Sequence, residues 1–108
     1  MVNSEPALDR SFLALAHPAR RAIVERLARG PAPVAEAAHG LALSKPAISK
    51  HVKVLEEAGL VGRAVHGREH RLRLRPDALD GAAVWLERHR ALWEAKFDAV
   101  ERQLERDG

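Results

Sequence analysis

The sequence predicts a mostly helical domain with one small β-hairpin, and three observations support this. Apolar residues recur at helical spacing through five segments of the chain. Only residues 61–74 alternate around a turn signal, as β-strands do. Residues 44–75 carry a net charge of +5 and the remainder carries −2, although the whole chain is only +3. A basic segment of this kind is typical of a nucleic-acid contact, and a length of 108 residues predicts one domain over 1–108.

The composition excludes several classes of site and protein. The chain has no cysteine, which excludes disulfides, thiolate metal sites and cysteine nucleophiles. Hydrophobic residues make up 46% and charged residues 31%, as in a folded globular protein. The chain shows neither a signal-peptide pattern nor an apolar run of membrane-spanning length. It is therefore predicted to be cytoplasmic, with no membrane partner.

Two helices are predicted at the start of the chain. The first spans residues 5–16 and ends there because the residue before Pro18 avoids the α region. Its apolar stripe consists of Leu8, Phe12 and Leu15. The second spans residues 18–29, with Pro18 in its first turn and Gly30 after its end.

A helix-turn-helix is predicted next. Residues 31–33 form a rigid proline-rich connector, and a short helix spans residues 34–39. Gly40 opens a tight turn into a second helix over residues 44–58. A short helix, a turn that contains glycine and a second helix with a polar face make up this motif.

The helix over residues 44–58 has one apolar face and one basic face. Ser44 is a good N-cap and Pro46 falls in the first turn, where a missing N–H costs nothing. The apolar face consists of Ile48, Val52 and Leu55. The residues away from it include Lys45, Ser49, Lys50 and Lys53. An ordinary solvated lysine face is the alternative, and the surrounding motifs favour DNA recognition.

The hairpin over residues 61–74 is predicted to be a two-stranded wing. A two-residue turn at 66–67 or at 67–68 gives the same parity of pairing. One face then carries Val61, Val65, Leu72 and Leu74. The other face carries Gly62, Ala64, Arg71 and Arg73. The sequence thus predicts a winged helix-turn-helix, with five helices and a wing whose tip is basic.

A long helix over residues 79–106 is predicted to dimerise the protein. Its apolar residues recur at steps of three and four, which makes a stripe too wide for a small helical core to cover. The predicted interface residues are Leu8, Phe12, Leu86, Trp93, Phe97, Val100 and Leu104. Packing of this helix against its own domain is the alternative.

Three segments resemble the ArsR-type winged helix-turn-helix repressors of bacteria. They are HPARRAIVERLARG at 17–30, LSKPAISKHVKVLEEAGLV at 43–61 and GRAVHGREHRLRL at 62–74. The resemblance covers essentially the whole chain. It implies a recognition helix in the major groove, a wing along the flanking DNA and a dimer through the first and last helices. By position it implies DNA contacts at Ser44, Lys45, Pro46, Ser49, Lys50, His51, Lys53, Arg63, His66 and Arg68.

No metal, cofactor or catalytic site is predicted. The region 34–40 has no cysteine pair, and His89 is the single histidine of the last helix, between two arginines. The chain therefore resembles the subgroup of the family that lacks metal ligands, and its motifs specify no inducer. Glu56 and Glu57 point about 100° apart on a helix, so they do not converge on a substrate.

The predicted function is a transcriptional regulator, in particular a repressor that binds an inverted-repeat operator in double-stranded DNA as a homodimer. One alternative is a winged-helix module that binds another protein, with weak DNA specificity or none. A second alternative is an architectural protein that binds DNA without regard to sequence.

Overall fold

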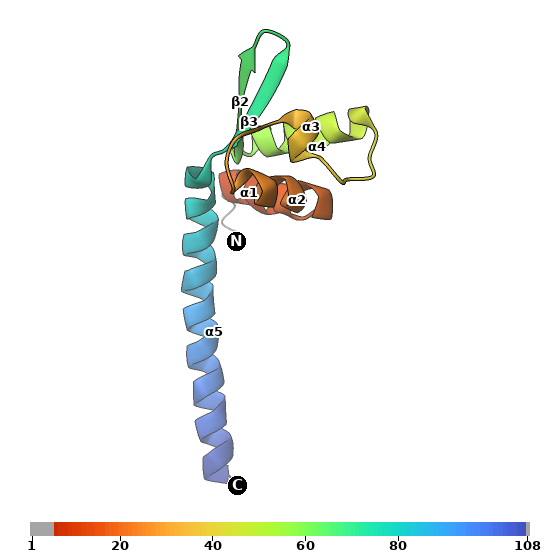
Figure 1. Cartoon of the computed structure of the whole chain (residues 1–108). Helices are drawn as coiled ribbons and strands as arrows, with labels where there is room; N and C mark the ends of the chain where they lie inside the picture. Colours follow the sequence, from red (N-terminus) through yellow and green to blue (C-terminus); the bar gives the residue numbers. More distant parts are fainter. Residues whose placement is uncertain (1–5, 108) are drawn as a thin grey trace.

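The computed structural model describes residues 6–107, and it has a small helical head from which one long helix projects (Figure 1). The predicted start of the first helix at residue 5 lies outside the described residues. The elements are α1 (Pro6–Leu15), α2 (Pro18–Leu27), β1 (Ala32–Pro33), α3 (Val34–Ala37), α4 (Lys45–Glu57), β2 (Val61–His66), β3 (Glu69–Leu74), the 3-10 helix η1 (Pro76–Leu79) and α5 (Asp80–Asp107). This is the winged helix-turn-helix that the sequence predicts.

The helix ends of the head follow local side-chain chemistry. Ser44 caps α4, since its Oγ accepts a hydrogen bond from the Ala47 N–H at 3.3 Å. His17 caps α2 in the same way, because its Nδ1 accepts from the Ala19 N–H at 3.0 Å. Gly59 ends α4 with a φ of +75°, which a residue with a Cβ rarely adopts. The structure thus gives His17 a capping role that the sequence pattern did not indicate.

The wing is part of a three-stranded antiparallel sheet of order β1-β3-β2. The register pairs Val61 with Leu74 and Arg63 with Leu72, which is the predicted parity. The prediction of a plain connector at 31–33 is wrong, because β1 pairs Ala32 with Leu72. A two-residue strand is too short to show alternation, so its partner on β3 determines it.

The core of the head is built largely from small side chains. Alanine supplies six of the thirteen buried hydrophobic residues in the described part of the chain. The largest fully buried side chains come from α2, α4, the turn after α4 and β3, and they are Ile23, Val52, Leu55, Leu60 and Leu72. Small side chains of this kind allow helices to approach one another closely.

The first helix departs from its predicted stripe. Its buried residues are Ser11 and Ala14, whereas Leu8 and Phe12 are only partly buried. Ser11 lies inside because its Oγ donates to the carbonyls of Ala7 at 3.1 Å and Ala78 at 3.4 Å. Satisfied hydrogen bonds remove most of the cost of burying a hydroxyl.

Three further boundaries and faces differ from the sequence prediction. The third helix ends at Ala37 rather than at residue 39, because the chain turns toward Gly40 with its φ of +85°. Val65 was predicted on the apolar face of the wing, but it is 55% exposed because the hairpin tip extends beyond the core. On α5 the sequence pattern also predicts Ala83 on the apolar stripe, but the buried residue is its neighbour Ala82 and Ala83 is exposed.

The long helix α5 touches the head only near its beginning and then extends away from it (Figure 1). Its 28 residues give the molecule a length of 68 Å, against 30 and 23 Å in the other directions. The alternative in which this helix folds back on its own domain is therefore not what the structure shows. None of the described helices is long and apolar enough to cross a membrane.

Candidate nucleic-acid interface

The exposed face of α4 carries the predicted base and phosphate contacts. Lys45, Ser49 and Lys53 follow one another at intervals of four residues, which aligns them along one side of the helix. All three are exposed, as are Ser44, Pro46 and Lys50. Val52 and Leu55, on the neighbouring side of the helix, are buried in the core. The helix thus presents a continuous polar and basic ridge to solvent.

The three lysines of this ridge carry no ion pair. Every ion pair among residues 6–107 uses an arginine instead, so Lys45, Lys50 and Lys53 keep their positive charge uncompensated. An exposed ammonium group without a carboxylate partner is available for a phosphate.

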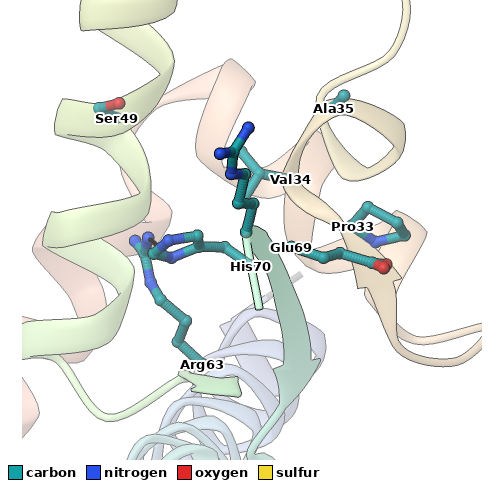
Figure 2. Close-up of a pocket in the computed structure, with 8 residues that line it drawn as sticks. Pro33, Val34, Ala35, Ser49, Arg63, Glu69 and His70 are labelled. Carbon is teal, nitrogen blue, oxygen red and sulfur yellow. Dashed lines mark hydrogen bonds between the residues drawn. The ribbon is translucent and has the colours of Figure 1, made fainter. Parts of the chain in front are cut away.

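The wing is attached to α4 by Arg63. Its guanidinium donates to the Glu56 carboxylate at 2.6 and 3.3 Å and contacts His70 Nδ1 at 3.0 Å. Figure 2 shows the Arg63 and His70 side chains pointing toward one another beside α4. Arg63 was predicted as a DNA contact, and that contact stays a prediction; in the structure its guanidinium joins the wing to α4. His66 and Arg68 lie at the exposed tip, where the turn at Gly67 has a φ of +63°.

Two hollows flank the ridge. One of about 370 Å³ opens between α3, α4 and the wing and is drawn in Figure 2; it is lined by Pro33, Val34, Ala35, Ser49, Arg63, Arg68, Glu69 and His70. Another of about 400 Å³ lies between α3 and α4, lined by Val34, Ala35, Ala38, Lys45, Ile48 and Ser49. Ser49 lines both hollows, so its side chain is accessible from two sides of α4.

His51 does not share the exposed face of α4. It is partly buried between the helices, where its Nδ1 lies 3.1 Å from Arg20 Nη1 and its ring lies 4.4 Å from that of His17. Burial is the main cause that lowers the pKa of the His51 imidazole, with the positive charges of its neighbours adding to the effect. The DNA contact predicted for His51 stays a prediction; in the structure its Nδ1 faces Arg20 of α2.

The predicted dimer residues of α5 are exposed. Leu86, Trp93, Phe97, Val100 and Leu104 are between 52% and 65% exposed. With 100° per residue they fall within a sector of about 60° on one side of the helix. The Trp93 and Phe97 rings lie 6.1 Å apart within this stripe. A continuous apolar stripe of this extent is typical of an interface between proteins.

Further exposed or aromatic residues border this surface, and of these only Leu13 was not indicated by the sequence pattern. Leu13 of α1 is 63% exposed, and Leu92 extends the stripe on α5. At the base of α5 the Trp85 ring meets Phe12 edge-on at 5.7 Å and stacks on His89 at 4.0 Å. The wider helical stripe predicts Trp85 and Leu92, whereas Leu13 lies off the predicted stripe of the first helix.

No cluster of three or more histidine, aspartate or glutamate side chains that could hold a metal ion occurs within residues 6–107. His89 lies against the Trp85 ring, and its Nδ1 contacts the Trp85 carbonyl at 2.8 Å.

Comparisons with known proteins agree with this geometry. A family of helix-turn-helix domains matches residues 15–62. The HTH-type transcriptional regulator Rv2034 of Mycobacterium tuberculosis is 46% identical over 80 residues, which cover 74% of this chain and 75% of that protein. A crystal structure of an ArsR family transcriptional regulator is 34% identical, with a TM-score of 0.79 over 87% of this chain and 97% of the other. The transcriptional repressor BigR from Xylella fastidiosa is 26% identical, with a TM-score of 0.58 over 66% of this chain and 74% of the other.

Proposed function

Because this chain belongs to the ArsR family of winged helix-turn-helix, DNA-binding transcriptional regulators, we propose that it is a repressor that binds an inverted-repeat operator as a homodimer. Repression is supported by the likeness to the repressor BigR. The protein then acts as a binding protein rather than an enzyme, in the cytoplasm, where the bacterial chromosome lies.

The observation that carries the proposal is the unpaired basic ridge of α4. Lys45 and Ser49 lie where a helix in the major groove reaches base edges, and a lysine ammonium suits the acceptors of guanine. Lys50 and Lys53 flank them and bind phosphate, which sets the register of the protein on the duplex. Ser44 and Pro46 shape the helix N-terminus, whose free N–H groups favour an anion.

The wing supplies a smaller contact. Arg68 and His66 at its tip reach the DNA that flanks the major groove. Arg63 contributes to binding mainly by its ion pair with Glu56, which fixes the angle between the wing and α4. His51 likewise acts from inside the head rather than on the DNA.

The homodimer forms through the apolar stripe of α5 together with Leu8, Phe12 and Leu13 of α1. Two copies related by a two-fold axis cover each other's stripes, which a single copy leaves in water. The axis also places two copies of α4 in successive major grooves, about 34–36 Å apart.

Selection from a random-sequence duplex library, followed by footprinting of the winner, tests this proposal. We expect an inverted repeat whose half-sites are protected about one helical turn apart. Uniform, salt-sensitive coating without a preferred sequence indicates the architectural protein instead. No enrichment at all indicates the module that binds another protein.

A further inference from the structure

Three side chains meet where α1, α2 and α4 converge. Arg20 of α2 donates to the carbonyls of Ala14 at 2.7 Å and Leu13 at 3.0 Å, which are at the end of α1. The same guanidinium lies 3.1 Å from Nδ1 of His51 on α4. The His17 ring packs against the His51 ring, with the two ring centroids 4.4 Å apart. Arg20 therefore joins the helix that carries Leu13 to the recognition helix.

The protonation state of His51 follows from its partner. Arginine has N–H donors and no acceptor, so His51 Nδ1 must accept the hydrogen bond and cannot carry a proton. The proton of the neutral ring then lies on Nε2. A second proton on Nδ1 would place an N–H against the N–H of Arg20, which abolishes the bond and sets two positive charges side by side.

The charges around His51 all oppose its protonation. Arg20 from α2, His17 from the α1–α2 junction and Lys50 from its own helix act on it, after burial itself, and no carboxylate is among these causes. They lower the pKa of His51 below its ordinary value of 6.5. As pH falls below 6.5 the unfolded chain binds the proton first, so the free energy of unfolding falls with pH and is greatest above that value.

We propose that Arg20 is a positioning residue, which holds the recognition helix in its DNA-binding orientation through neutral His51, so that protonation of His51 weakens operator binding. The inference rests on the proposed function. The expected effect of acid on operator affinity is the opposite of that of a direct DNA contact. A protonated His51 imidazole against a phosphate would strengthen binding, whereas loss of the Arg20–His51 bond weakens it.

The test measures the dissociation constant for the selected duplex at about pH 7.5 and about pH 5.5, one unit on either side of the ordinary histidine pKa. Each protein is compared with itself at the two pH values, so differences in basal affinity cancel. His51→Asn keeps an acceptor near the position of Nδ1 and cannot be protonated. Arg20→Lys keeps the charge but cannot reach all three acceptors.

Arg21→Lys is the matched control. Arg21 donates to the Leu15 carbonyl at 2.7 Å, so it also caps α1, but it has no hydrogen bond to His51. The same measurement on this variant reports what loss of an arginine cap on α1 does by itself.

Acidification should weaken wild-type binding more than it weakens binding by His51→Asn, by less than about tenfold at pH 5.5, because His51 is only partly protonated there when its pKa lies below 6.5. Arg20→Lys should behave as His51→Asn does, and Arg21→Lys as the wild type does. An equal pH response in wild type and His51→Asn, or wild-type binding that strengthens relative to it, overturns the inference.

A spectroscopic measurement on the free protein separates this inference from the proposed function. If the library yields no duplex, the proposed function fails, and ¹⁵N NMR of the His51 ring decides the inference alone. We expect Nδ1 to be unprotonated at neutral pH and the pKa of His51 to lie below 6.5 in the wild type and to rise in Arg20→Lys. A protonated Nδ1, or a pKa that Arg20→Lys leaves unchanged, overturns it.

Discussion

Truncation of Trp93 tests the dimer most directly. This side chain is 61% exposed, and tryptophan can bury up to about 250 Å², so about 150 Å² of it remains open to a partner. At about 25 cal/mol per Å², full coverage corresponds to about 4 kcal/mol in each subunit. Coverage of half that area in both subunits gives about 4 kcal/mol per dimer. Interface tryptophans typically cost 2 kcal/mol or more on truncation, so Trp93→Ala should raise the dimer dissociation constant about 30- to 1000-fold.

Sedimentation equilibrium at micromolar concentration measures this change. Val84→Ala is the control, because Val84 is also an exposed apolar residue of α5 but lies nine residues away, on the opposite side of the helix. Operator affinity should fall in Trp93→Ala although no DNA contact has changed. A wild type that sediments as a monomer refutes the reasoning, as does a Trp93→Ala variant that dimerises as tightly as the wild type.

The remaining predictions concern the DNA face and metals. Lys50→Ala should weaken specific and non-specific binding by similar factors and lower the salt slope by about one unit, because one phosphate contact is lost. Unchanged affinity and slope in titrations at several salt concentrations would show that α4 does not read DNA. Ser49→Ala should alter the preference among operator variants by about 1–3 kcal/mol at one base pair, and an equal loss on all variants would contradict base reading. Zinc, cadmium and arsenite at low micromolar concentration should leave the operator complex intact in a mobility-shift assay. Stoichiometric zinc that is lost on substitution of His89 or His66 would contradict this prediction.

Local signals in the sequence predict most of the fold. The N-cap at Ser44, the first-turn Pro46 and the glycine at 59 are each short-range features, and α4 begins and ends close to where they indicate. Both candidate turns have two residues, so either one predicts which residues of the wing share a face. The observed pairing of Val61 with Leu74 is the register that the turn at 67–68 gives.

Features that depend on distant contacts could not be predicted in this way. β1 exists because β3 pairs with it, and the burial of Ser11 depends on the Ala78 carbonyl 67 residues away. At the candidate site, helical periodicity identifies the exposed lysines but does not show which polar side chains find partners inside the molecule. His51 and Arg63 both have such partners, on α2 and on α4, and the position of a residue in the motif does not reveal these partners.

The alanine-rich core makes the head unequally tolerant of mutation. At Ala14 and Ala32, which are fully buried, there is little side chain to remove, so truncation leaves only a small void. An added methyl or isopropyl group at these two buried positions has to displace neighbouring atoms, and overpacking of this kind typically costs about 1–3 kcal/mol. Substitutions are therefore tolerated mainly on the surface of α4, at the wing tip and on α5. Changes at these exposed positions can alter DNA or partner specificity without disturbing the packing of the helices.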